Sequence, residues 1–438
     1  MATMSGNKNL SQHSKIERNP SINRISLMRG IYRALLQNGR TYAAFESKYV
    51  LPLIEVLASR REILDPMSGY GSLISFCSTV DEPVSAFCIE YNPPSYLWQV
   101  LINPINAKKI IALTDCLMEM KHNWPVTSVR AMSSNEWFPP ESFRLLIEVW
   151  TLCYEIAGTL SLKGKARVEI PLAFLLPFAG RLSACVQGNV VTHIKQGGLC
   201  IYEGWHHDFS NYIDVLRKRI VQISGESKNI KHKSLLANCL TVKLPINKFS
   251  AMITSPPYPN SRDYAAMFGP ENAFIDYLEE LGMVENFSLK ERLIGCPRVS
   301  EIDDSYKKTI DDVKSQSARA FLNTLVNYKG SKGAIYDEHI YYLPSLAKYF
   351  YELESAYENI SPALSEDFEG YIIVINNTHR KQMIPVYQCV IETWQRLGFN
   401  AEIAKEYTRE LPHVGGLNPR VKGISARHTE YTIRVSRQ

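Results

Sequence analysis

Residues 61–76 read REILDPMSGYGSLISF, a pattern that predicts a short strand, a tight glycine turn and the start of a helix. Asp65 stands at the end of the apolar run, and Gly69 and Gly71 form a Gly-x-Gly turn after it. Because glycine has no Cβ, a turn of this kind lets a ligand approach the backbone closely. The stretch therefore predicts an α/β fold with a ligand site at the end of its first strand.

A second strand is predicted at residues 85–89, and Glu90 follows it, about 20 residues after the glycines. An acidic side chain at this place can accept hydrogen bonds from both hydroxyls of a ribose. A nicotinamide cofactor would be recognised by similar residues. It is disfavoured here, because Asp65-Pro66 precedes the glycines and the third glycine of Gly-x-Gly-x-x-Gly is absent.

A stiff proline turn follows another apolar run, in residues 249–264, which read FSAMITSPPYPNSRDY. Each proline fixes φ, removes a backbone N–H and favours extended geometry in the residue before it. The turn at residues 255–258 therefore presents carbonyl acceptors beside a serine hydroxyl and the ring of Tyr258. Such a turn suits a flat heteroaromatic ring with an exocyclic amino group, whereas Pro-Pro alone more often only ends a strand.

Taken together, the two motifs resemble those of the DNA amino-methyltransferases that use S-adenosylmethionine. The glycine motif of that family is usually Asp-Pro-Phe-x-Gly-x-Gly-Thr, and here Met67 replaces the phenylalanine and Ser72 the threonine. The Ser-Pro-Pro-Tyr turn is typical of the N4-cytosine enzymes. The continuation at residues 260–264 and the pattern of the last hundred residues also resemble this family.

The resemblance implies a role for eleven residues of this chain. Those implied to bind the cofactor are Asp65, Pro66, Gly69, Gly71, Ser72, Glu90 and Asn238. Those implied to act on the target amine are Ser255, Pro256, Pro257 and Tyr258. In the family an acidic residue often follows the third strand and meets the adenine amine, whereas this chain has Asn238 there, whose amide oxygen is a weaker acceptor.

The implied reaction is methyl transfer to the N4 amine of cytosine in double-stranded DNA. N6-adenine methylation needs the same kind of turn, RNA methylation is a further alternative, and a non-catalytic subunit with the same fold would bind DNA or a partner. A carbon-5 enzyme would need a Pro-Cys dipeptide, and this chain has only the reverse order, at Cys296-Pro297. The resemblance also suggests a prokaryotic protein that associates with the nucleoid when bound to DNA, with a restriction or defence component as partner.

The composition agrees with a protein of the cell interior. Hydrophobic residues make up 45% of the 438 residues, and 49 Lys and Arg against 44 Asp and Glu give a formal charge of +5, which permits a nucleic-acid partner. The nine cysteines are scattered without a Cys-x-x-Cys pair, so we expect reduced thiols and no metal site. No apolar run approaches the roughly 20 residues that span a bilayer, and the amino terminus lacks a signal-peptide core, so we expect a cytoplasmic protein.

The pattern along the chain predicts a Rossmann-like class I methyltransferase sheet, mostly parallel and doubly wound, with a large helical insertion. We expect a flexible arm at residues 1–24, a core at residues 25–98 and 232–438, and an inserted, mainly helical lobe at residues 99–231. Helices are predicted at residues 140–158, 171–186 and 385–397. After Gly398 we expect a loop before a final strand at residues 430–435. The inserted lobe is expected to grip DNA, chiefly through its basic stretch at residues 193–198, or to mediate subunit contact. Residues 283–340 compete with it for the role of reading DNA.

Overall fold

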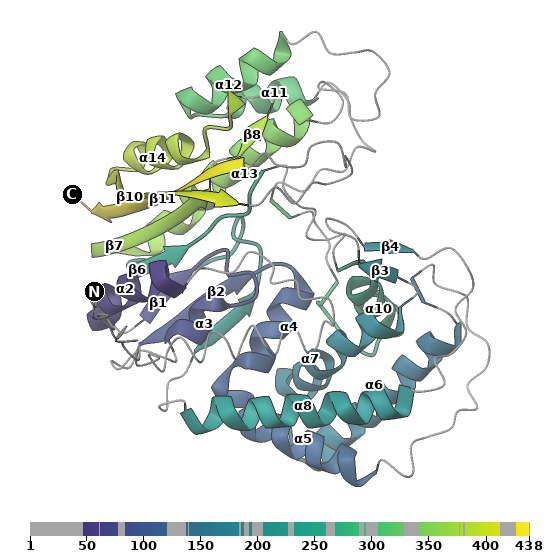
Figure 1. Cartoon of the computed structure of the whole chain (residues 1–438). Helices are drawn as coiled ribbons and strands as arrows, with labels where there is room; N and C mark the ends of the chain where they lie inside the picture. The colour runs from purple at the N-terminus through teal and green to yellow at the C-terminus, as the bar shows by residue number, and fades with distance from the viewer. Residues whose placement is uncertain are drawn as a thin grey trace, which may run out of the picture.

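The computed structural model has a mixed α/β architecture built on one seven-stranded sheet (Figure 1). It describes residues 47–60, 62–77, 84–120, 137–138, 140–183, 185–187, 192–194, 205–226, 232–259, 268–288, 293–294, 305–327, 342–375, 377–379, 382–411 and 426–437. The strands of the large sheet, in chain order, are β1 (Glu62–Asp65), β2 (Ser85–Glu90), β5 (Lys233–Leu236), β6 (Phe249–Thr254), β7 (Leu364–Ile375), β10 (Phe399–Leu411) and β11 (Ala426–Arg437).

The sheet is mostly parallel, and the order of its strands reverses at one point. Across the sheet the order is β10-β11-β7-β6-β1-β2-β5, and every neighbouring pair from β7 to β5 is parallel. Only β11 runs antiparallel, between β7 and β10. From β1 the chain moves outward to β2 and β5, and then returns to the other side of β1 at β6. Ligands of such sheets bind at this switch point, outside the carboxyl ends of the strands.

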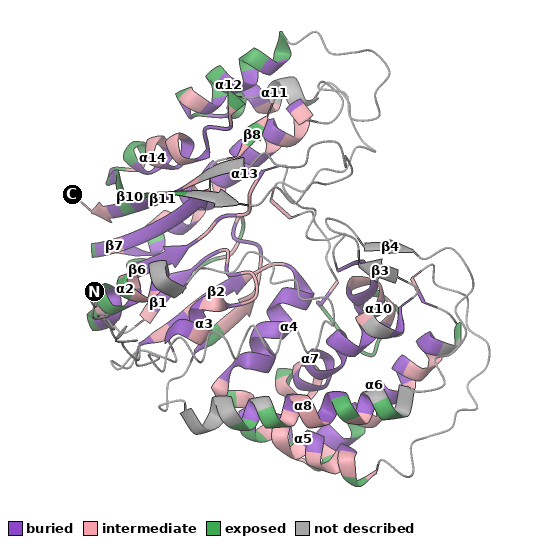
Figure 2. Ribbon diagram, in the orientation of Figure 1, coloured by how far each residue is buried: buried purple, intermediate pink, exposed green. Residues whose placement is uncertain are grey.

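Helices cover both faces of the sheet, as expected for a doubly wound fold (Figure 2). One face carries α2 (Ser47–Leu57), α3 (Ser72–Cys77) and α4 (Pro93–Ile102), and α10 (Gly269–Glu280) packs on α4 and on a later helix, α7 (Lys165–Leu182). The other face carries α11 (Ser305–Asp312), α12 (Gln316–Val326), α13 (Leu343–Ile360) and α14 (Val386–Arg396). Alternate side chains of each strand point to the two cores: Ile63 packs with the first group and Leu64 with the second.

Between β2 and β5 the described chain is mainly helical, and residues 93–226 are here called the α4–α8 region (Figure 1). After α4 it contains η2 (Pro104–Asn106), α5 (Ala107–Glu119), α6 (Pro140–Thr159), α7 (Lys165–Leu182), β3 (Cys185–Gln187), β4 (Thr192–Ile194) and α8 (Trp205–Glu226). The helix predicted at residues 140–158 is confirmed as α6. The helix predicted at residues 171–186 corresponds to α7, but its bounds were wrong: α7 begins earlier, continues through Pro171 and Pro177 and ends at Leu182, and Val186 lies in β3. Buried neighbours such as Phe174 support this helix despite the lost backbone bonds.

The carboxyl-terminal part contains one long strand where a loop was predicted. Gly398 ends α14 with φ of 84°, as its position suggested, but β10 begins directly after it. Phe399 and Ala401 are buried, whereas most later residues of β10 whose burial is described are charged or polar and exposed. Edge strands often carry exposed charged side chains, which prevent pairing with other chains. Such a strand shows little of the apolar alternation by which strands are predicted.

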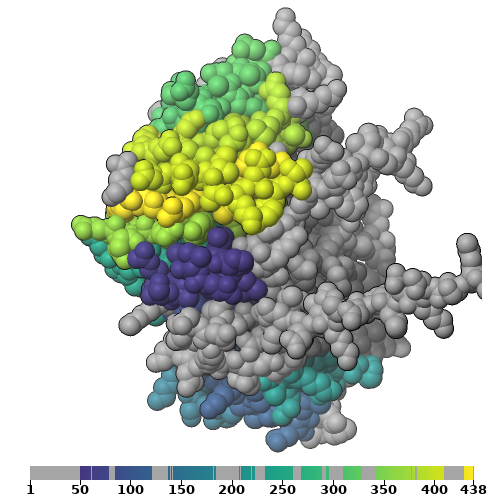
Figure 3. All heavy atoms as spheres, turned by 60° about the vertical axis from the view of Figure 1, so that its left-hand side comes forward, coloured from purple at the N-terminus to yellow at the C-terminus, as the bar shows by residue number. Residues whose placement is uncertain are grey.

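The first helix is tied to the sheet next to these carboxyl-terminal strands. Arg60, in η1 (Ala58–Arg60) after α2, donates a hydrogen bond to Asp367 of β7. Figure 3 shows the same arrangement on the surface, where α2 lies next to the strands of the carboxyl-terminal half. The fold therefore brings the two ends of the described chain to one side of the sheet.

Several predicted segments lie outside the described residues. These are the arm at residues 1–24, residues 260–264 after the proline turn, residues 195–198 of the basic stretch, and much of residues 283–340. No helix among the described residues is long and apolar enough to cross a membrane.

Candidate functional site

The two predicted motifs meet at the switch point of the sheet. Asp65 ends β1 and Thr254 ends β6, the strand beside it. Thr254 Oγ1 donates a 2.8 Å hydrogen bond to Asp65 Oδ1, although the two residues are 189 positions apart in the sequence. Both side chains are fully buried. The glycine turn and the proline turn therefore leave the sheet from neighbouring strand ends, where ligands of this type of sheet bind.

The glycine turn adopts backbone angles that favour glycine. Gly69 has φ of 50° and Gly71 has φ of 73°, both in the left-handed region. A Cβ on Gly69 would meet no atom within 4 Å, whereas a Cβ on Gly71 would lie 2.7 Å from Cγ of Gln99. The space beside Gly69 is thus open to a ligand, and the space beside Gly71 is already filled by the protein.

Ser68 fastens this turn to the next strand. Its backbone N–H and its hydroxyl both donate to the carbonyl oxygen of Ile89 in β2, over 3.1 Å and 2.9 Å. Within the turn, the Gly71 N–H donates to the Ser68 carbonyl oxygen at 2.8 Å. Pro66 stands between β1 and the turn, and Ser72 is the first residue of α3. The predicted cofactor residues of this motif therefore form one compact loop.

Asp65 is a buried carboxyl group with an unused oxygen. Its Oδ1 accepts from Thr254 and, at 3.3 Å, from the Met67 N–H. Its Oδ2 is buried and has no hydrogen-bond partner among the residues that the structure describes. Burial raises the pKa of Asp65 to about 7, although the hydrogen bonds from Thr254 and Met67 act in the opposite direction. A cationic group placed near Oδ2 would stabilise the ionised carboxylate.

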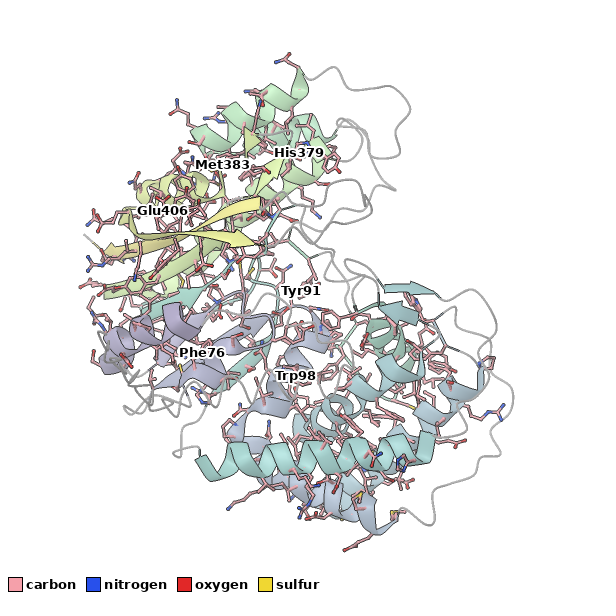
Figure 4. The ribbon with its side chains drawn as sticks, viewed as in Figure 1. Phe76, Tyr91, Trp98, His379, Met383 and Glu406 are labelled. Carbon is pink, nitrogen blue, oxygen red and sulfur yellow. The ribbon has the colours of Figure 1, made fainter. Side chains whose placement is uncertain are left out.

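Glu90 ends β2 beside this loop and is partly buried. Its carboxylate accepts from the Asn92 N–H at 2.8 Å and from the Gly69 N–H. Burial raises the pKa of Glu90 above its usual range, and these backbone donors partly offset the effect. Figure 4 shows Tyr91, the next residue, at the start of α4. The carboxylate of Glu90 is therefore held next to the glycine turn, where it can reach a ligand bound beside Gly69.

Asn238 follows β5 and lies in the turn that leaves the edge of the sheet. Its Oδ1 accepts from the Leu240 N–H at 2.9 Å, and its backbone oxygen accepts from the Val242 N–H, also at 2.9 Å. The preceding residue, Ala237, donates its N–H to the carbonyl oxygen of Glu90 at 2.9 Å. Asn238 thus lies close to Glu90 in the fold, and its side chain shapes its own turn.

The proline turn is held by its own side chains and by the end of β7. The hydroxyl oxygens of Ser255 and Tyr258 are 3.1 Å apart and share a hydrogen bond. Asn377, just after β7, donates from Nδ2 to the carbonyl oxygen of Pro259 at 3.2 Å. Pro256 is buried, whereas Ser255 and Tyr258 are only partly buried. The side chains of Ser255 and Tyr258 are therefore in contact with each other and partly accessible.

The chain returns to the glycine turn just before α10. Phe268 precedes this helix, and its ring lies 5.6 Å from the ring of Tyr70, between the two glycines. Tyr70 also contacts the ring of Trp98 at 6.4 Å, and Figure 4 shows Trp98 on α4. Thr254, before the proline turn, and Phe268, just before α10, thus each contact the stretch from Asp65 to Tyr70.

Sequence reasoning missed three residues that build the site. The sequence pattern assigns no role to Thr254, at the end of the apolar run before the prolines, or to Asn377. Gln99 received no interpretation, although a buried amide among the apolar residues 96–102 is an unusual feature. Each of the three acts through a contact between segments that are distant in the sequence.

Comparisons with known proteins do not place this chain. A scan against protein families finds no family that matches it, and a search of curated proteins finds no match. Among the described residues there is also no group of three or more His, Cys, Asp or Glu side chains that could hold a metal ion. The residues of the site itself therefore carry the functional argument.

Proposed function

We propose that this protein methylates the exocyclic N4 amine of cytosine in double-stranded DNA, with S-adenosylmethionine as the methyl donor. The observation that carries the proposal is the hydrogen bond from Thr254 to Asp65 at the switch point of the sheet. It joins a turn suited to the cofactor to a turn suited to an aromatic amine. The mostly parallel sheet, covered by helices on both faces, supports the class I methyltransferase fold that the motifs suggest.

The residues of the first turn fit the cofactor. The buried Asp65 Oδ2 has no partner among the described residues, and it would neutralise the ammonium group of the methionine end. Glu90 would accept from the ribose hydroxyls, and the open space beside Gly69 would admit the ligand close to the backbone. Asn238 would contribute at the adenine end. When bound, S-adenosylmethionine supplies a methyl group on a sulfonium that leaves as a neutral thioether.

The residues of the second turn fit an amine. Ser255 Oγ and the carbonyl oxygen of Pro256 would each accept one N–H, which orients the nitrogen and increases its electron density. Tyr258 Oη can donate to Ser255 Oγ while the second lone pair of that oxygen accepts from the amine. The ring of Tyr258 would stack on a base that has been flipped out of the duplex. Pro257 keeps the turn rigid.

We expect DNA to bind mainly to regions outside the central sheet. We interpret residues 99–231, which include most of the α4–α8 region, as an inserted lobe that grips DNA, and residues 283–340 as the competing candidate for sequence recognition. A small positive net charge agrees with such a partner. A cognate restriction or defence component in a prokaryotic cytoplasm completes this proposal.

The direct test is a nucleoside analysis. Double-stranded DNA of mixed sequence is incubated with the protein and methyl-deuterated S-adenosylmethionine, digested to nucleosides, and analysed by mass spectrometry. We expect deuterated N4-methylcytosine from the wild type and almost none from Ser255→Ala. Deuterated N6-methyladenine would reassign the target base. The same assay with RNA tests the remaining substrate, and absence of label in every nucleic acid would refute the proposal.

A further inference from the structure

Gln99 reaches from α4 into the glycine turn. This side chain is fully buried, and its Nε2 donates to the Ser68 hydroxyl at 2.8 Å and to the Gly69 carbonyl oxygen at 2.6 Å. The carbonyl of Gly69 can only accept, so the NH₂ end of the amide must face it. A buried amide on an otherwise apolar helix is thus directed at the loop proposed to bind the cofactor.

The carbon chain of Gln99 also explains why residue 71 is glycine. A Cβ at this position would come within 2.7 Å of Gln99 Cγ and 3.3 Å of its Cδ. The two residues therefore fit each other: glycine leaves the space, and Gln99 fills it. A long side chain with a donor at its end meets both requirements at once.

Gln99 and Glu90 together fix the backbone of Gly69. The Gly69 carbonyl oxygen accepts from Gln99, and its N–H is directed to the carboxylate of Glu90. Gly69 has φ of 50°, which glycine adopts without strain, but glycine can adopt many other backbone angles about as readily. Holding both of its polar backbone groups removes that freedom and aims the N–H at Glu90. Gln99 thereby acts on Glu90 through a single residue.

We propose that Gln99 is a positioning residue for cofactor binding, which sets the Gly69 backbone and through it the carboxylate that meets the ribose. This inference rests on the proposed function, because it concerns the same site. The amide oxygen of Gln99, Oε1, is buried and has no hydrogen-bond partner among the described residues. Burying an unused acceptor is unfavourable, so a side chain that only filled space would be better served by methionine or leucine.

Two variants separate positioning from packing. Gln99→Met keeps the length of the side chain but has no donor, and Gln99→Glu keeps the shape but presents a carboxylate to the Gly69 carbonyl oxygen. The matched control is Asn103→Leu, which removes another buried amide at the end of the same helix. Asn103 Nδ2 donates to the carbonyl oxygen of His232 at 3.1 Å, and its Oδ1 accepts from the Ile105 N–H. These contacts do not involve the glycine turn.

The experiment measures S-adenosylmethionine affinity of the full-length protein by titration calorimetry, followed by KM and kcat with DNA. We expect Gln99→Met to weaken binding about tenfold and to raise KM accordingly, with kcat within about twofold of the wild type. Asn103→Leu should lower the melting temperature without this loss of affinity. Equal affinity in Gln99→Met and the wild type, or equal losses in Gln99→Met and Asn103→Leu, would overturn the inference.

The pH dependence gives a readout that does not depend on how well a variant packs. Protonation restores a donor in Gln99→Glu but not in Gln99→Met, so the ratio of their affinities should favour Gln99→Glu increasingly as the pH falls. Asp65 and Glu90 titrate in both variants, so the ratio reports what the residue at position 99 adds to the pH profile, including its effect on these two neighbours. A ratio that stays constant with pH would contradict a positioning role. Failure of the wild type itself to bind the cofactor would instead refute the proposed function.

Discussion

The glycine turn after β1 and the proline turn after β6 hold their shapes in opposite ways. The glycine turn uses left-handed backbone angles and depends on hydrogen bonds from Ser68 and Gln99 to stay in place. The proline turn has few backbone donors, and the rings of Pro256 and Pro257 restrict it covalently. One turn is thus part of the folded core, and the other is a stiff extension from it. Substitutions should therefore cost stability in the first turn and turnover in the second.

The largest expected effect on stability is that of Gly71→Ala. Alanine must adopt φ of 73°, which costs about 1–2 kcal/mol, and its Cβ must displace Gln99, which costs about 1–3 kcal/mol more. Gly69→Ala should cost only the first amount, since its Cβ meets no atom. Urea unfolding of both variants checks this difference.

Gly69→Ala should lower cofactor affinity more than Gly71→Ala, although it should cost less stability. A Cβ on Gly69 enters the space left for the ligand, whereas a Cβ on Gly71 affects the ligand only indirectly, by displacing Gln99. In a Gln99→Ala background the cost of Gly71→Ala should shrink, because Cγ is gone. Equal stability losses at Gly69 and Gly71 would show that packing against Gln99 does not contribute.

The contact between the two turns has the next largest effect. Thr254→Val keeps the shape of the side chain but removes the donor to the buried Asp65 Oδ1. The free energy of unfolding should fall by about 1–3 kcal/mol at neutral pH, because a buried acceptor loses its partner. Thr254→Ser, which retains the hydroxyl, is the control and should lose less. If valine were as stable as threonine, the junction would not depend on this bond.

The titration of Asp65 should appear in cofactor binding. Its pKa is raised to about 7, so the carboxyl group is largely protonated at pH 6 and largely ionised at pH 8. A cationic ligand favours the ionised form, and affinity should therefore rise by up to about tenfold per pH unit below the pKa and level off above it. Calorimetric titrations at several pH values measure this slope. Asp65→Asn should bind more weakly and lose this part of the pH dependence.

The smallest effect on stability is expected in the proline turn. Tyr258→Phe removes the hydroxyl that shares a hydrogen bond with Ser255 and retains the ring. The free energy of unfolding, followed by thermal melting, should fall by about 0.5–1.5 kcal/mol, since the partly exposed hydrogen bond to Ser255 is removed. Turnover should fall less than in Ser255→Ala. A loss of stability as large as that of Gly71→Ala would remove the distinction between the two turns.

The sequence predicts the residues of both turns, but it does not predict the contacts that hold the turns in place. Asp65, the glycines, Glu90 and Ser255 to Tyr258 are local patterns, and strand ends in a parallel sheet bring such patterns to one edge. The bond between Thr254 and Asp65 joins segments that share no local pattern, so only the fold shows it. The same holds for Gln99, whose single hint was a polar residue among apolar neighbours. The edge strand β10 was missed because many of its exposed side chains are charged, which hides the apolar alternation of a strand.

The most direct test of the central claim compares methyl transfer and cofactor binding in one variant. Ser255→Ala removes an acceptor from the proline turn and leaves the glycine turn unchanged. With radiolabelled S-adenosylmethionine and double-stranded DNA, we expect this variant to bind the cofactor like the wild type and to transfer the methyl group about 10²–10³-fold more slowly. Transfer at the wild-type rate would contradict the account, and so would a wild-type protein that binds the cofactor but transfers no label to DNA.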